Sequence, residues 1–142
     1  MSTTYKKQNE HTTSAQPFPT HTTKETIAVI GLGYVGIPLA ILEEERGYSV
    51  IGYDIDLRKI ATLKDKRAEF LSPSEYQIFK RSKARFTADD HVLAAANIFI
   101  ICVPTPVDEL HEPDLSPVIS ASRIIGKYVM RGSVVVIEST VN

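Results

Sequence analysis

The chain has 142 residues, which suit one ordinary domain rather than two, and its 43% hydrophobic content can supply a core. A formal net charge of −1 argues against a dedicated nucleic-acid or polybasic membrane surface, and a single cysteine excludes an internal disulfide framework. The single cysteine suits a reducing cytoplasm, where we expect the protein; there is no apolar run of about 18 residues and no signal-peptide pattern. The four histidines are scattered without a Cys, Asp or Glu at ligand spacing, which predicts no metal site.

Residues 1–25 are rich in Thr, Ser, Gln, Lys and His and contain few large apolar side chains. Such a segment cannot bury enough surface to offset the entropy that it would lose on ordering. We therefore expect a disordered N-terminal tail, and place the domain at residues 26–142.

Apolar runs and helical patterns alternate from residue 26 onward. The predicted strands are 27–30, 49–53, 85–87, 98–103 and 133–137. The predicted helices are 35–46, 56–64, 73–83, 89–95 and 116–129. Regular alternation of this kind predicts a parallel sheet with right-handed crossovers, which is a doubly wound α/β domain of the Rossmann type.

Local signals support two of these helices. Val35, Leu39 and Leu42 recur at helical spacing and predict the apolar face of the first helix. Ser72 at the N-cap and Glu75 three residues later form a capping box, which predicts the start of the third helix.

The segment Gly31-Leu32-Gly33-Tyr34-Val35-Gly36 follows a predicted strand and opens a predicted helix, as the dinucleotide-binding fingerprint requires. Gly31 permits a tight turn, Gly33 lets the backbone approach a pyrophosphate, and Gly36 lets the helix pack closely on the strand. The helix N-terminus offers free N–H groups and partial positive charge to an anion. The alternative is a turn and helix that bind nothing.

Asp54 ends the second predicted strand about 20 residues after the glycines, where an acid accepts hydrogen bonds from the adenosine ribose. Its charge would repel a 2′-phosphate, which favours NAD over NADP as the cofactor. Arg58 and Lys59 follow one helical turn later. They are interpreted either as cations that accept a 2′-phosphate or as a solvated helix face.

The loop Val103-Pro104-Thr105-Pro106-Val107 follows the strand at 98–103, and ligands of open α/β sheets bind at such carboxyl strand ends. Its prolines stiffen it, and Thr105 offers a hydroxyl to the ribose or pyrophosphate; a plain rigid loop is the alternative. Cys102 is interpreted as a small buried strand residue rather than a nucleophile, because no base stands near it in the pattern.

The last predicted strand ends in the polar segment Glu138-Ser139-Thr140, beside the expected nicotinamide. Glu138 is either a structural carboxylate that accepts backbone N–H groups or a catalytic group.

Together these pieces resemble the UDP-glucose/GDP-mannose dehydrogenase family over roughly residues 26–142. The matching segments, in chain order, are Gly31-Leu32-Gly33-Tyr34-Val35-Gly36-Ile37-Pro38-Leu39-Ala40, Tyr53-Asp54-Ile55-Asp56, Val103-Pro104-Thr105-Pro106, Pro113-Asp114-Leu115-Ser116-Pro117 and Glu138-Ser139-Thr140-Val141. The third and fourth segments look most like bacterial enzymes that oxidise UDP-N-acetylhexosamines for surface polysaccharides.

The resemblance implies an NAD-dependent oxidoreductase that converts the C6 alcohol of UDP-glucose or a UDP-N-acetylhexosamine to the uronic acid with two NAD. It implies that Thr140 lies near the nicotinamide and the catalytic water. The cofactor-binding residues that we assign from the motif and the resemblance are Gly31, Gly33, Tyr34, Val35, Gly36, Asp54, Lys59, Val103, Pro104, Thr105, Pro106, Ser139 and Thr140.

The family's catalytic cysteine lies downstream of the matched segments, and Cys102 does not match it. The family's sixth strand, dimer helix and sugar-binding domain would also follow Asn142. We therefore expect a fragment truncated before the sixth strand, inactive by itself, from a protein that forms a homodimer or larger oligomer. The alternatives are a β-hydroxyacid-type dehydrogenase domain and a stand-alone NAD-binding module without catalysis.

Overall fold

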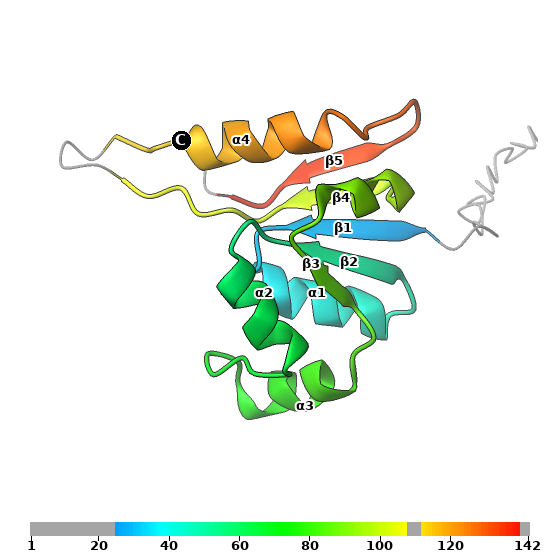
Figure 1. Ribbon diagram of the computed structural model, residues 1–142, viewed down its shortest axis with the longest axis vertical. Coiled ribbons are helices and arrows are strands. Elements are labelled where there is room, and N and C mark those ends of the chain that lie inside the picture. The colour runs from blue at the N-terminus through cyan, green and yellow to red at the C-terminus, as the bar shows by residue number, and fades with distance from the viewer. Residues whose placement is uncertain (1–24, 108–111, 140–142) are drawn as a thin grey trace, which may run out of the picture.

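Five parallel strands form one sheet between two layers of helices in the computed structural model, which describes residues 25–107 and 112–139 (Figure 1). The strands are β1 (Thr26–Ile30), β2 (Ser49–Tyr53), β3 (Arg85–Thr87), β4 (Ile98–Ile101) and β5 (Val134–Ile137). Their order in the sheet is β3-β2-β1-β4-β5, and every neighbouring pair is parallel. The predicted doubly wound α/β fold is confirmed.

The helices are α1 (Gly36–Glu45), α2 (Leu57–Lys64), α3 (Pro73–Arg81), the 3₁₀ helix η1 (Asp90–Ala95) and α4 (Ser116–Ile125). Figure 1 shows α4 on one side of the sheet and α1 and α3 on the other. No helix among the described residues is long and apolar enough to cross a membrane. Of the predicted tail, only residue 25 lies within the described residues.

The apolar core is divided by the sheet into two clusters. The cluster beneath α1, α2 and α3 includes Val29, Ile37, Ile41, Leu63, Phe79 and Phe86. The cluster beneath η1 and α4 includes Ile30, Leu93, Phe99, Ile101, Ala121 and Ile125. Because alternate residues of β1 enter opposite clusters, this strand is buried on both faces, as its continuous apolar run predicts.

The sheet places the carboxyl ends of three central strands side by side. Ile30 of β1 is in register with Tyr53 of β2 and with Ile101 of β4. The chain leaves β1 and β2 toward the helices of one face, and the segment after β4 leads to α4 on the other. This reversal of strand order at β1 opens a crevice where doubly wound domains bind ligands.

The predicted apolar face of α1 is only partly right: Leu39 packs against the core cluster, but Val35 and Leu42 do not face inward. Val35 and Leu42 are 54% and 40% exposed, whereas Ile37, Ala40 and Ile41 are fully buried. The helix begins at Gly36, which has no side chain to hold it off the sheet, so the small Ala40 one turn later also lies against the strands. Close approach at small residues, rather than the row of larger apolar side chains, sets the buried face.

Several element ends also differ from the predictions. β4 ends at Ile101 rather than 103, α3 at Arg81 rather than 83, and α4 at Ile125 rather than 129. Residues 90–95 form a 3₁₀ helix, capped by Asp89 through a 3.1 Å bond from the His91 N–H. The predicted capping box at Ser72 is present.

The connection between α2 and α3 is held by Lys66, the only described non-glycine residue in the left-handed backbone region, with φ of 56°. Its ammonium donates to the carbonyl oxygens of Phe79 (3.2 Å) and Ser82 (2.7 Å), at the end of α3. The Tyr76 hydroxyl donates to the Lys66 carbonyl at 3.1 Å. A cation at a helix C-terminus also interacts favourably with the helix dipole.

We expect Lys66→Ala to lower the free energy of unfolding by about 2 kcal/mol, because two charge-assisted hydrogen bonds are lost while the strained backbone remains. Lys66→Gly should lose about 1 kcal/mol less, because glycine adopts the left-handed region without strain. Urea denaturation measures both changes, with Lys64→Ala as the exposed control. If both Lys66 variants unfold at the same urea concentration as the unsubstituted chain, the assignment of Lys66 is contradicted.

Candidate cofactor site

The glycine loop between β1 and α1 is shaped by sterics at each glycine. Gly31 has φ of 93°, and a Cβ there would lie 2.9 Å from backbone atoms of Cys102. A Cβ on Gly36 would overlap the Gly31 carbonyl oxygen, whereas a Cβ on Gly33 would meet nothing within 4 Å. The tight turn and the close packing predicted for Gly31 and Gly36 are confirmed. The open space at Gly33 is what a closely approaching ligand needs.

The start of α1 carries unused hydrogen-bond donors. The Ile37 N–H donates to the Gly33 carbonyl at 3.2 Å, but no hydrogen bond among the described residues uses the N–H groups of Tyr34, Val35 or Gly36. Val35 at the N-cap provides no side-chain cap. These donors and the positive end of the helix dipole can together bind an anion such as a pyrophosphate.

The buried Asp54 carboxylate holds three segments together. Its Oδ2 accepts the Leu32 N–H at 2.9 Å and the Lys59 ammonium at 2.6 Å. Its Oδ1 accepts the Asp56 N–H at 2.9 Å. The residue therefore fixes the glycine loop and the start of α2. Because each carboxylate oxygen can accept two bonds, Oδ1 keeps capacity for one more donor.

The two cations in the first turn of α2, Arg58 and Lys59, differ in their surroundings. Lys59 is half-buried against Asp54, whereas Arg58 is almost fully exposed, with its Nε 3.9 Å from an Asp56 oxygen. Asp56 itself caps α2 by accepting the Arg58 and Lys59 N–H groups, which hold the pKa of its carboxyl below the usual range. The solvated-face interpretation therefore fits Arg58 and not Lys59.

Two cavities flank the glycine loop at the crevice. The first has a volume of about 500 Å³ and extends along α4; the second, of about 450 Å³, extends along the glycine loop toward the end of β5. Both are lined by Gly31, Asp54, Lys59, Val103 and Pro104. Because the two cavities share this rim, they form one elongated site. A dinucleotide is also an elongated molecule.

The structure brings most of the predicted site residues to the second cavity. Besides the shared rim, its lining includes Gly33, Tyr34, Val35, Thr105, Glu138 and Ser139. Pro106 lines neither cavity; its carbonyl accepts the Asp114 N–H at 2.7 Å, beside the antiparallel bridge between Val107 and Pro113. Thr140 lies outside the described residues.

Ser139 and Glu138 behave differently at the end of β5. The Ser139 hydroxyl donates to the Val103 carbonyl at 2.6 Å and so ties β5 to the loop after β4. The Glu138 N–H donates to the Ile101 carbonyl at 2.9 Å, but its carboxylate accepts no hydrogen bond among the described residues. The expected structural role for this carboxylate is therefore not supported there, and the group stands exposed at the cavity rim.

Cys102 lines the second cavity but is not activated. Burial, followed by the negative charge of Glu138, raises the pKa of its thiol to about 11. At neutral pH the thiol is therefore protonated, and the thiolate that acts as a nucleophile is scarce. Cys102 is buried, as predicted, but it follows β4 rather than lying within the strand.

One wall of the first cavity was not predicted. The N-terminal half of α4 supplies Ser116, Pro117, Ser120 and Ala121 to its lining, together with Ile124. The segment Pro113-Asp114-Leu115-Ser116-Pro117 matches a family motif, but its sequence alone predicts no cofactor contact. The small side chains one turn apart on this helix are the signal that could have found the wall.

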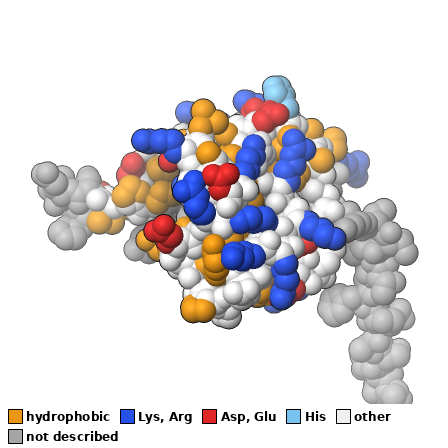
Figure 2. All heavy atoms as spheres, turned by 60° about the horizontal axis from the view of Figure 1, so that its bottom comes forward, with side chains coloured by type: hydrophobic (Ala, Val, Ile, Leu, Met, Phe, Trp, Pro, Cys, Tyr) orange, Lys and Arg blue, Asp and Glu red, His pale blue; other side chains and the backbone are white. Residues whose placement is uncertain are grey.

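Lys and Arg side chains gather on the face that carries α2 and α3 (Figure 2). Residues 57–85 contain nine Lys and Arg against three Asp and Glu. Four of these cations pair with carboxylates, namely Arg58, Lys59, Arg67 and Arg81. The surplus positive charge beside the crevice favours an anionic ligand over a neutral one.

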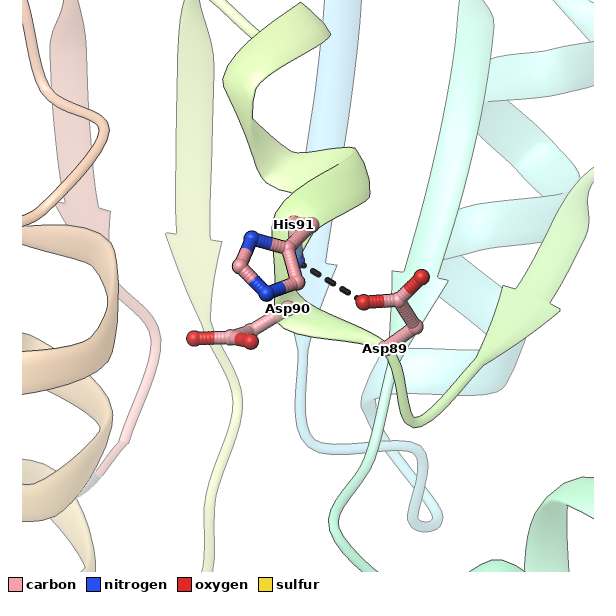
Figure 3. A group of neighbouring side chains, drawn as sticks. All are labelled: Asp89, Asp90 and His91. Carbon is pink, nitrogen blue, oxygen red and sulfur yellow. Dashed lines mark hydrogen bonds between the residues drawn. The ribbon is translucent and has the colours of Figure 1, made fainter.

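Three neighbouring side chains, Asp89, Asp90 and His91, offer ligand atoms within 4.8 Å of one another (Figure 3). Asp89 already caps η1, and Asp90 accepts the Lys127 ammonium at 3.1 Å, which lowers the pKa of its carboxyl. Figure 3 shows the Asp89 and Asp90 carboxylates directed to different sides of the imidazole. The group therefore links η1 to the segment after α4 and is not assigned as a metal centre. It does correct the expectation that no Asp or Glu stands at ligand spacing from a histidine.

The strand order, the glycine loop and the acid after β2 define a doubly wound domain of the dinucleotide-binding class. Comparison with known proteins identifies the family. Residues 25–142 match the NAD binding domain of the UDP-glucose/GDP-mannose dehydrogenase family, and the chain belongs to that family.

The relatives of this chain are much longer proteins. It is 42% identical over 115 residues to UDP-N-acetyl-D-glucosamine 6-dehydrogenase of Pseudomonas aeruginosa, covering 81% of this chain and 27% of that protein. It is 40% identical over 119 residues to UDP-N-acetyl-D-mannosamine dehydrogenase of Pyrococcus horikoshii, covering 81% and 28%. A solved structure of UDP-D-ManNAc dehydrogenase from Pyrococcus horikoshii superposes with a TM-score of 0.77 at 38% identity, over 82% and 28% of the chains.

Proposed function

We propose that the chain binds NAD across the two cavities, with the adenosine in the first, the pyrophosphate at the glycine loop and the nicotinamide in the second. The observation that carries this proposal is the shared rim: both cavities meet at Gly31, Asp54 and Lys59, beside the unused N–H groups at the start of α1. The pyrophosphate is the anionic part of a dinucleotide, and free N–H groups at a helix N-terminus bind anions.

Asp54 is proposed to select the cofactor. Its Oδ1 has capacity for a ribose hydroxyl, and its charge disfavours a 2′-phosphate at the same position. Lys59 is engaged with the Oδ2 of Asp54 at 2.6 Å, so this cation is already neutralised. Of Arg58 and Lys59, the exposed Arg58 alone is left to attract a 2′-phosphate, which favours NAD over NADP.

We infer that the protein to which this chain contributes oxidises the C6 alcohol of a UDP-sugar to the uronic acid. The support is family membership and the likeness to UDP-N-acetylhexosamine dehydrogenases. NAD supplies the hydride acceptor, and the described residues supply its binding and orientation. The thiol of such an oxidation is not Cys102, because that group is buried and protonated at neutral pH. Glu138 and Thr140 are proposed as auxiliary groups beside the nicotinamide.

Titration calorimetry of the purified chain with NAD and NADP tests the cofactor proposal. We expect saturable one-to-one binding of NAD and binding of NADP that is at least about tenfold weaker, which corresponds to about 1.4 kcal/mol. ADP-ribose should bind nearly as well as NAD, because it retains the adenosine and the pyrophosphate. No heat of binding with either dinucleotide would contradict the proposal, and tighter binding of NADP would contradict the role of Asp54.

A further inference from the structure

An aromatic contact links the glycine loop to a segment that lines neither of the two cavities. Tyr34 lies within the loop and is 80% exposed, and its ring centroid is 4.8 Å from that of Phe70, with the planes tilted by 59°. Phe70 belongs to the connection between α2 and α3 and is 40% exposed. Aromatic pairs at this separation and tilt attract each other beyond their burial of area.

Phe70 is presented to Tyr34 by an immobilised segment. Its neighbours Ala68 and Leu71 are buried in the core cluster beneath α1, α2 and α3. Lys66 at the start of the same connection is fixed by its two bonds to the end of α3. A large, exposed aromatic side chain between two buried anchors is unusual for a plain connecting loop, which normally exposes polar residues.

The part of the glycine loop that needs support is the part that Tyr34 occupies. Leu32 before it is held by Asp54, and Ile37 after it is held by the Gly33 carbonyl. Between them, no hydrogen bond among the described residues uses the N–H groups of Tyr34 or Val35. The Val35 carbonyl accepts the Leu39 N–H at 3.1 Å, and the ring contact with Phe70 restrains the side chain of Tyr34.

We propose that Phe70 is a positioning residue for the cofactor: it holds Tyr34 and thereby keeps the loop N–H groups in the arrangement that receives a pyrophosphate. The inference rests on the proposed binding of NAD and deepens it. Phe70 does not line either cavity, so its effect on binding passes through Tyr34. Without the contact the loop spends less time in the competent arrangement, and the apparent affinity falls by the same fraction.

The test compares Phe70→Ala, Phe70→Tyr and Val129→Ala in the full chain. Val129 is a matched control, because it is also 40% exposed and lines neither cavity. Calorimetry with NAD and ADP-ribose, and an NMR titration with adenosine, give the affinities. We expect Phe70→Ala to weaken NAD and ADP-ribose about five- to tenfold and adenosine less than twofold, since adenosine lacks the pyrophosphate.

Phe70→Tyr should restore the affinity, because the ring contact is retained, and Val129→Ala should bind as the unsubstituted chain does. In the absence of ligand, ¹⁵N relaxation order parameters of Tyr34 and Val35 should fall in Phe70→Ala alone. Equal affinities of Phe70→Ala and the unsubstituted chain for NAD would overturn this inference and leave the proposed function standing. An equal loss of affinity for adenosine in Phe70→Ala would also overturn this inference and leave the proposed function standing. Failure of the unsubstituted chain to bind NAD would overturn both.

Discussion

Gly36→Ala is expected to unfold the chain partly and to abolish NAD binding. The added Cβ would overlap the Gly31 carbonyl oxygen and lie 3.4 Å from the Cys102 side chain, so α1 would have to move off the sheet. Because backbone atoms rather than a flexible side chain receive the clash, relaxation is difficult. We expect the free energy of unfolding to fall by about 3 kcal/mol, measured by urea denaturation.

Gly33→Ala is the matched control for this substitution, because it adds the same methyl group to the same loop. Its Cβ would meet nothing within 4 Å, so the stability of the chain should change by less than about 0.5 kcal/mol. NAD should nevertheless bind at least about tenfold more weakly, since the methyl group would fill space left for the pyrophosphate. The steric assignment fails if Gly36→Ala is as stable as Gly33→Ala.

Asp54→Ala is expected to weaken NAD binding about a hundredfold and to lower the free energy of unfolding by about 2–3 kcal/mol. The substitution removes the acceptor of the Leu32 and Asp56 N–H groups and leaves the half-buried Lys59 ammonium without its partner. It also removes the proposed ribose acceptor. Both the stability of the fold and the affinity for NAD should therefore fall.

Lys59→Ala is the informative comparison, because it breaks the same ion pair from its solvent-exposed side. Asp54 would keep both backbone donors, so we expect a loss of less than about 1 kcal/mol in stability and less than about fivefold in NAD affinity. Calorimetry and urea denaturation of the two variants give both quantities. Equal losses of affinity in the two variants would show that Asp54 does not receive the ribose.

Much of the fold could be predicted from the sequence because its signals are local. The strand at 49–53, the capping box at Ser72 and the turn glycines each depend on a few adjacent residues. The buried face of α1 could not be predicted in this way. The closeness of Gly36 to the sheet, rather than the hydrophobicity of Val35 and Leu42, decides which side faces inward.

In the candidate site, too, local features are predictable from the sequence and tertiary contacts are not. The glycine loop and Asp54 were found because their spacing is short and chemically specific. The α4 wall of the first cavity, the ion pair that neutralises Lys59 and the contact between Tyr34 and Phe70 depend on the tertiary fold. The α4 wall and the aromatic contact join segments that are distant in the chain, so no pattern of adjacent residues records them. The ion pair spans only five residues, but it depends on how the turn after β2 places the start of α2.

The uneven distribution of charge has a consequence for how the molecule meets other charged bodies. Residues 57–85 carry a surplus of six positive charges, from nine cations and three anions. The rest of the described residues contain four cations and eleven anions, a surplus of seven negative charges. The chain therefore carries its charge unevenly despite a net charge of −1. A charged resin, polymer or neighbouring subunit would meet an excess of cations at the face of α2 and α3, which the isoelectric point of about 6.4 does not reveal.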